Sequence, residues 1–165
     1  MTETDRLLQE TPSYRALWFL VRAYHSLLPP LNRFFEERGI TGPQFGVMRC
    51  VADAGSGGLM LSDLSKKLLV TCGNITGVVD RLEQAGYLRR VRPPGDRRVV
   101  LAQLTPEGLA LYREMMPAYQ ELLGGLMACL EIEEKEVIAQ ACERLHLALE
   151  EQRQPEPVVN GTRDG

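Results

Sequence analysis

The chain has 165 residues, 44% of them hydrophobic, and a formal net charge of −3. This length is enough for one domain with a buried core, and no apolar run approaches the roughly 20 residues that span a bilayer. Four scattered cysteines without a C-x-x-C pair predict reduced thiols in a cytoplasmic protein and argue against a disulfide scaffold.

The first predicted element is an amphipathic helix over residues 12–38. Its apolar residues recur at the three- and four-residue spacing of one helix face. Pro29 and Pro30 should kink or break it, because proline lacks a backbone donor. Thr41 and Gln44 then form a capping box, which predicts a short second helix. The apolar face of the first helix consists of Tyr14, Leu17, Trp18, Val21, Tyr24, Leu28 and Leu31.

Two short helices are predicted after a glycine-rich turn. Residues 61–68 place leucines on one face, with Ser62 positioned to cap the helix. Residues 72–85 place Ile75, Val78, Val79 and Leu82 on a core face, while the opposite face is small and polar. Gly86 follows where a C-terminal cap belongs.

The residue pattern then changes to that of strands. Residues 87–92 and 98–104 contain β-forming residues on either side of a Pro/Gly/Asp turn, which predicts a short antiparallel ribbon. A helix pair followed by a ribbon with arginines at its tip is typical of a winged helix-turn-helix. The predicted fold is therefore mainly α with a small β-hairpin wing, and the winged lobe spans residues 41–104.

Residues 105–151 are predicted to form two long C-terminal helices. Thr105 and Pro106 begin the first, which carries a heptad-like seam that Pro117 should bend or interrupt. Helices of this length exceed what a small winged lobe needs for its own core. We therefore expect residues 12–38 and 105–151 to form a homodimer, and the polar residues 152–165 to be a disordered tail.

The local charge favours DNA as the partner of the lobe. Between Leu59 and Leu104 eight basic residues face four acidic ones, a local charge of +4 that leaves −7 for the rest. The helix over 72–85 has few charges, so its outer face suits a major groove, where amides and hydroxyls read base edges. Lys66, Lys67 and Arg92 would join Arg89 and Arg90 in holding phosphates. The predicted DNA-binding residues are Ser62, Lys66, Thr71, Cys72, Gly73, Asn74, Thr76, Gly77, Arg81, Arg89, Arg90, Arg97 and Arg98.

Five motifs follow one another in this part of the chain: Leu61-Ser-Asp-Leu-Ser-Lys-Lys-Leu68, Gly73-Asn-Ile-Thr-Gly-Val-Val-Asp-Arg-Leu-Glu83, Gly86-Tyr-Leu-Arg-Arg90, Asp96-Arg-Arg98 and Leu104-Thr-Pro-Glu-Gly108. In order and spacing they resemble the MarR (multiple antibiotic resistance regulator) family. The resemblance implies a homodimer on a palindromic operator of double-stranded DNA. It also implies a recognition helix over 73–85, a wing over 89–101 and a minor-groove contact by Arg98. In the loop, Asp96 would orient the arginines.

The resemblance further implies control by a small molecule or by oxidation. An effector crevice would lie between the dimer helices and the lobe, and a small aromatic or phenolic acid would suit it. Tyr24, His25, Phe45, Met48 and Arg49 are the candidate lining residues, although aromatic residues at helical spacing are as well explained by a core. The function predicted is a DNA-binding transcription regulator, a repressor that its effector releases from the operator.

Other functions have less support in the sequence. We find no nucleophile motif, phosphate-binding glycine loop or metalloprotease motif, so we expect no enzyme, cofactor or metal. Oxidation of Cys72 at the start of the recognition helix is an alternative trigger, because a helix N-terminus lowers a thiol's pKa. An alternative of another class is a helical dimerisation module that binds a protein through its winged surface.

Overall fold

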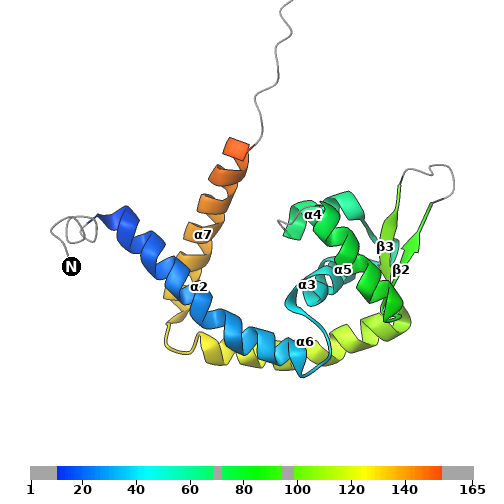
Figure 1. Cartoon of the computed structure of the whole chain (residues 1–165). Coiled ribbons are helices and arrows are strands. Elements are labelled where there is room, and N and C mark those ends of the chain that lie inside the picture. The colour runs from blue at the N-terminus through cyan, green and yellow to red at the C-terminus, as the bar shows by residue number, and fades with distance from the viewer. Residues whose placement is uncertain (1–10, 69–71, 94–98, 154–165) are drawn as a thin grey trace, which may run out of the picture. The chain divides into compact units, whose positions relative to one another are not determined.

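The computed structural model describes residues 11–68, 72–93 and 99–153. The chain divides into two compact units, Met1–Glu121 and Leu122–Gly165. It is mainly helical with one small sheet (Figure 1), which confirms the predicted fold class. The elements are α2 (Pro12–Glu36), α3 (Gly42–Asp53), the 3-10 turn η1 (Gly55–Gly57), β1 (Leu59–Met60), α4 (Leu61–Leu68), α5 (Cys72–Gln84), β2 (Leu88–Val91), β3 (Leu101–Leu104), α6 (Pro106–Leu126) and α7 (Ile132–Arg153).

The helix α2 continues through both of its prolines, so the predicted break does not occur. Each proline removes one helical hydrogen bond, to the carbonyl of His25 or Ser26. Both of these residues are exposed, so water can take the place of the missing donors. The helix ends where Gly39 adopts a φ of 70° and Ile40 N–H donates to the carbonyl of Phe35 at 3.2 Å.

The starts of the next two helices show one confirmed cap and one wrong one. Thr41 and Gln44 form the predicted capping box of α3, in which Thr41 N–H donates to Gln44 Oε1 at 2.8 Å. Ser62, by contrast, is the second residue of α4, so the prediction that it caps this helix is wrong. The helix begins at Leu61, directly after the short strand β1, and Asp63 lies in its first turn.

The helix α5 has the predicted core face, because Ile75, Val78, Val79 and Leu82 are all buried. It ends as predicted at Gly86, whose φ of 77° favours glycine. Gly86 N–H donates to the carbonyl of Glu83, and Tyr87 N–H donates to that of Leu82. These two bonds close the helix and turn the chain directly into β2.

The sheet has three antiparallel strands in the order β1-β3-β2. The pairing of β2 with β3 confirms the predicted ribbon within the described residues, and Arg90 lies opposite Ala102 in its register. The sequence did not indicate β1, which pairs Leu59 with Ala102 on the other edge of β3. This third strand ties the wing to the start of α4.

The core of the first unit joins α3, α4 and α5 to the sheet, and aromatic rings extend it to α2 and α6. The ring of Phe45 lies 5.2 Å from that of Phe35, 5.8 Å from Tyr112 and 4.9 Å from Tyr119. Tyr112 and Tyr119 lie seven residues apart on α6, at the spacing of the predicted heptad-like seam. Part of this seam therefore packs within the chain itself.

The first C-terminal helix is continuous, and the second is longer than predicted. Pro117 does not interrupt α6, and α7 continues to Arg153, so residues 152 and 153 are helical and not part of a disordered tail. Residues 154–165 lie outside the described part of the chain. Among residues 11–68, 72–93 and 99–153, no helix combines the length and apolar character that crossing a bilayer requires.

Candidate nucleic-acid interface

The outer face of α5 is the surface that the sequence predicts to read DNA. Its buried face fixes the helix against the core, which leaves Asn74, Thr76 and Arg81 exposed on the other side. Gly77 lies among them, and the space where its Cβ would be is open. Asn74, Thr76 and Gly77 are small and uncharged, which suits close approach to base edges, while the charges of α5 follow them in Asp80, Arg81 and Glu83.

The wing divides its two central arginines between opposite faces of the sheet. Successive side chains of a strand point to opposite faces, so Arg90 shares a face with the buried Leu88, while Arg89 points the other way. Arg89 is exposed and donates a hydrogen bond to Gln103 Oε1 at 3.1 Å. Gln103 also donates to the carbonyls of Ser56 and Gly57, so the turn before β1 helps to place Arg89.

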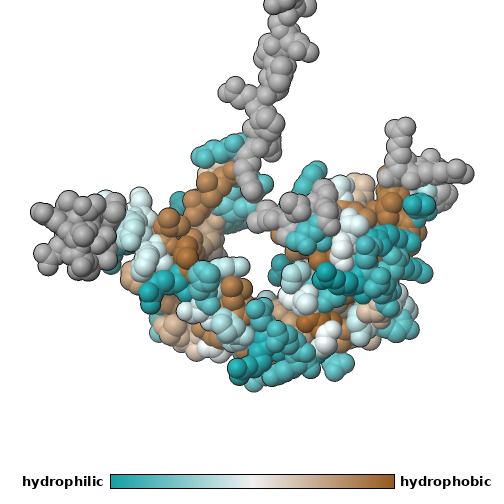
Figure 2. All heavy atoms as spheres, in the orientation of Figure 1, coloured by the Kyte–Doolittle hydropathy of each residue, from teal (hydrophilic) through white to brown (hydrophobic). Residues whose placement is uncertain are grey.

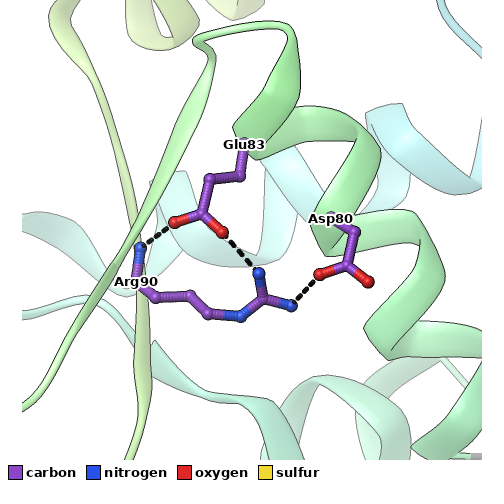
Figure 3. Close-up of polar contacts among 3 residues, drawn as sticks. All are labelled: Asp80, Glu83 and Arg90. Carbon is purple, nitrogen blue, oxygen red and sulfur yellow. Dashed lines mark hydrogen bonds and ion pairs between the residues drawn. The ribbon is translucent and has the colours of Figure 1, made fainter.

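Arg90 is engaged by two carboxylates of α5 (Figure 3). Its guanidinium forms an ion pair with Asp80 at 2.6 Å and another with Glu83, and its backbone N–H donates to Glu83 Oε1 at 3.0 Å. Burial acts to lower the pKa of Arg90, but the hydrogen bonds and charges of Asp80 and Glu83 outweigh it and raise the pKa above its ordinary value. The side chain of Arg90 is only 24% exposed. The sequence prediction of a phosphate contact did not anticipate this arrangement.

Other predicted phosphate contacts remain open to solvent. Lys66 is 80% exposed and lies 4.0 Å from Asp63 one turn earlier in α4, a distance at which little energy is gained. Lys67 and Arg92 are exposed as well. Arg92 and Arg90 line a pocket of about 400 Å³ together with Leu61, Thr76 and Val100. The pocket therefore lies where α4, α5 and the wing meet.

Several predicted contacts lie outside the described part of the chain or at its edge. Thr71, Asp96, Arg97 and Arg98 lie outside the described residues. Cys72 and Gly73 are the first residues of α5, but only their backbone is described. Their roles in binding DNA stay predictions.

The wing and α5 are anchored together to the start of α6. Thr105 donates its hydroxyl proton to the carbonyl of Gly86 at 2.6 Å and accepts from Gly108 N–H at 3.0 Å. Thr105 N–H donates to the carbonyl of Tyr87 at 3.1 Å. A Cβ on Gly108 would come within 1.9 Å of that same carbonyl oxygen, so only glycine fits there. This junction, formed by Gly86, Tyr87, Thr105 and Gly108, connects a helix predicted to form dimers with the end of the recognition helix.

The candidate effector residues fall into two groups. Phe45 and Met48 are buried in the core of the first unit, at 3% and 0% exposure. Tyr24 and His25 are exposed on α2, where their rings contact each other at 5.7 Å, and Arg49 is exposed on α3. Phe45 and Met48 are therefore core residues, as in the alternative to an effector crevice.

Sequence comparison relates the chain to known regulators. Residues 40–100 match the model of the MarR family. The chain is 32% identical over 128 residues to the HTH-type transcriptional regulator MhqR of Bacillus subtilis. This alignment covers 78% of this chain and 87% of MhqR. The residues that match the family model include α3, α4, α5 and β2.

Solved structures show the same fold. A mutant of MarR from E. coli in complex with operator DNA has a TM-score of 0.72 and 26% identity, over 84% of this chain and 97% of that one. BpsR of Bordetella bronchiseptica, whose DNA binding is regulated by 6-hydroxynicotinic acid, has a TM-score of 0.71 and 27% identity over 80% and 98%. NadR in complex with 4-hydroxyphenylacetate has a TM-score of 0.65 and 28% identity over 76% and 88%.

Proposed function

Because the chain belongs to the MarR family of transcriptional regulators, we propose that it is a homodimeric repressor, released from a palindromic operator by a small-molecule effector. The observation that carries the proposal is that α5, whose outer face begins with small polar residues, lies beside a wing that bears arginines. A duplex can receive such a helix in its major groove while the wing reaches the neighbouring minor groove. We place the protein in the cytoplasm and assign it no enzymatic role.

Different parts of the lobe would contact different parts of the duplex. Asn74 and Thr76 on the outer face of α5 would hydrogen-bond to base edges, and Gly77 would let the backbone approach. Lys66 and Arg92 would hold phosphates. Arg98 would enter the minor groove, where a narrow A·T-rich segment attracts arginine. Most of the sequence specificity would then come from α5, and most of the salt dependence from the cations around it.

Exposed apolar side chains on the terminal helices support the homodimer. In α2, Leu17 is 61% exposed, and in α7 Val137 is 65% exposed. Figure 2 shows hydrophobic atoms at the surface along α7. Large apolar side chains exposed along a helix are typical of a protein interface, and two-fold pairing would present two copies of α5 to a palindrome. The large exposed apolar residues of α2 and α7 are Leu17, Trp18, Phe19, Leu20, Val21, Tyr24, Ile132, Val137, Ile138, Leu145, Leu147 and Leu149.

The effector we propose is a small aromatic or phenolic acid. Compounds of this kind bind NadR and regulate BpsR. On this chain Tyr24, His25 and Arg49 are the exposed candidates for contact with such an acid. A ligand that binds better to one spacing of the two lobes than to another would shift the dimer away from its DNA-binding form.

Selection of bound sequences from a random pool of duplexes, at two salt concentrations, tests the proposal. We expect an inverted repeat with half-site centres roughly 34–36 Å apart, and affinity that falls steeply as salt rises. The double variant Arg97→Ala/Arg98→Ala should bind much more weakly and with a smaller salt dependence, whereas Arg144→Ala on α7 is the matched control. Failure to select any sequence, or full binding by the double variant, would contradict the proposal.

A further inference from the structure

A single side chain joins the wing to the recognition helix through two ion pairs. Arg90 of β2 contacts Asp80 and Glu83, which are three residues apart on α5 and therefore lie on one face of that helix. The planar guanidinium presents its donors in a fixed fork, and here each terminal nitrogen holds a different carboxylate. A fork that is held at two points fixes both the distance and the direction between helix and strand.

We propose that Arg90 is a positioning residue of the DNA-binding surface: held between Asp80 and Glu83, it sets the wing against the recognition helix and does not bind phosphate. This inference rests on the proposed function and deepens it. A lobe that must engage a major groove with α5 and a minor groove with the wing needs a fixed separation between them. Arg90 fixes that separation before DNA arrives, which lowers the cost of ordering the wing on binding.

The charges of the cluster support positioning over phosphate binding. One guanidinium between two carboxylates has a net charge of −1, which repels a phosphate. Arg90 would have to leave both partners to reach the DNA backbone. Removing either carboxylate has opposite consequences under the two roles. A phosphate-binding Arg90 would be freed and DNA would bind more tightly, whereas a positioning Arg90 would lose its hold and DNA would bind more weakly.

The isosteric variant Glu83→Gln separates these outcomes. We expect operator affinity to fall roughly threefold to tenfold, although the variant removes a negative charge from the DNA-binding unit. Asp63→Asn is the matched control, since Asp63 also pairs with a predicted phosphate cation, Lys66, but within a single helix. It should leave affinity unchanged or raise it.

The salt dependence of binding gives a second readout. Each phosphate contact adds about 0.9 to the slope of log affinity against log salt. Arg90→Gln should weaken binding with the slope unchanged, because no phosphate contact is lost. Arg92→Gln should weaken binding and reduce the slope by about 1.8 for a dimer with one such contact in each half-site. Circular dichroism and urea unfolding of each variant identify any loss that comes from unfolding.

The outcomes distinguish this inference from the proposed function. If the wild-type protein selects an operator but Glu83→Gln binds it as tightly or more tightly, the positioning role is overturned and the DNA-binding proposal stands. The same holds if Arg90→Gln reduces the salt slope as Arg92→Gln does. If the wild-type protein selects no duplex, the proposed function fails, and the role of Arg90 fails with it.

Discussion

Gly77 stands in the middle of α5, where a residue without a side chain weakens a helix. Among the described residues nothing lies within 4 Å of the position that its Cβ would take, so no close contact among them requires a glycine there. Its neighbours on the outer face of the helix, Asn74 and Thr76, are exposed. A partner that comes close to the backbone of α5 would require a residue as small as glycine at this position. In the proposed complex that partner is the floor of a major groove.

The variant Gly77→Ala should therefore stabilise the fold and weaken DNA binding. Alanine loses less conformational freedom in a helix, so the free energy of unfolding should rise by about 0.5–1 kcal/mol in urea titrations. Operator affinity, measured by fluorescence anisotropy, should fall because the added methyl group prevents close approach. Gly124→Ala in α6 is the control, since its Cβ position is equally open. Equal affinities for wild type and Gly77→Ala would refute a close approach at this position.

The elements that the sequence predicted well are those whose signals are local. The capping box of Thr41, the core face of α5 and the glycine cap at Gly86 all involve residues within one or two turns of one another. The strand β1 was not predicted because two residues carry no periodic pattern, and it exists only through its pairing with β3. The break predicted at the prolines of α2 does not occur. A proline in a sequence indicates that a backbone donor is missing, but it does not indicate whether water can bond to the carbonyl that loses its partner.

The candidate site was predictable in outline but not in its internal contacts. The basic residues of the wing and the polar face of α5 can be seen in the sequence. Which arginine is held inside the lobe depends on the strand register and on the turn at Gly86, which bring Arg90 to Asp80 and Glu83. The sequence did contain a signal for this contact. It has two acids three residues apart on one helix, followed by an arginine in the next strand. Counting charges alone assigned Arg90 to phosphate.

One added methyl group should have a strong effect at the junction between α6 and the turn after α5. Gly108→Ala would bring a Cβ against the carbonyl oxygen of Tyr87, which is backbone and cannot rotate away. We expect a loss of about 1–3 kcal/mol in the free energy of unfolding, from overpacking and from the disturbed hydrogen bonds of Thr105.

Urea unfolding of Gly108→Ala beside Gly124→Ala isolates the contribution of the close contact. Both variants add one methyl group to α6, but only Gly108→Ala meets neighbouring atoms. The first should lose stability and the second should gain about 0.5–1 kcal/mol from helix propensity. A Gly108→Ala protein as stable as the wild type would show that the start of α6 moves easily, and that the junction does not hold α5.

Over the whole molecule, charge and apolar surface are divided between different regions. The net charge is +4 between Leu59 and Leu104 and −7 elsewhere, whereas the exposed apolar side chains concentrate on α2 and α7. A single lobe with so few positive charges has little electrostatic affinity for DNA. Two lobes joined in one dimer double the phosphate contacts, and the second half-site then binds at a high effective concentration.

This division predicts the behaviour of a dimer-deficient variant. Leu17→Glu combined with Leu145→Glu places four carboxylates in an interface formed by two copies, where burying unpaired charge is costly. Light scattering should show a monomer, while circular dichroism should show unchanged helix content because both leucines are exposed within the chain.

DNA binding by that monomer reveals what dimerisation contributes. Each remaining lobe keeps its own phosphate contacts, so the salt slope on a half-site duplex should be about half the slope of the wild-type dimer on the full operator. Affinity for the full operator should fall by at least 100-fold, since the gain from joining two sites is lost. The variant Gln140→Glu, which adds a charge to an exposed polar position of α7, should leave both properties unchanged. A double variant that remains dimeric would show that the apolar residues of α2 and α7 are not the interface. A monomer that retains full operator affinity would instead show that one lobe suffices for recognition.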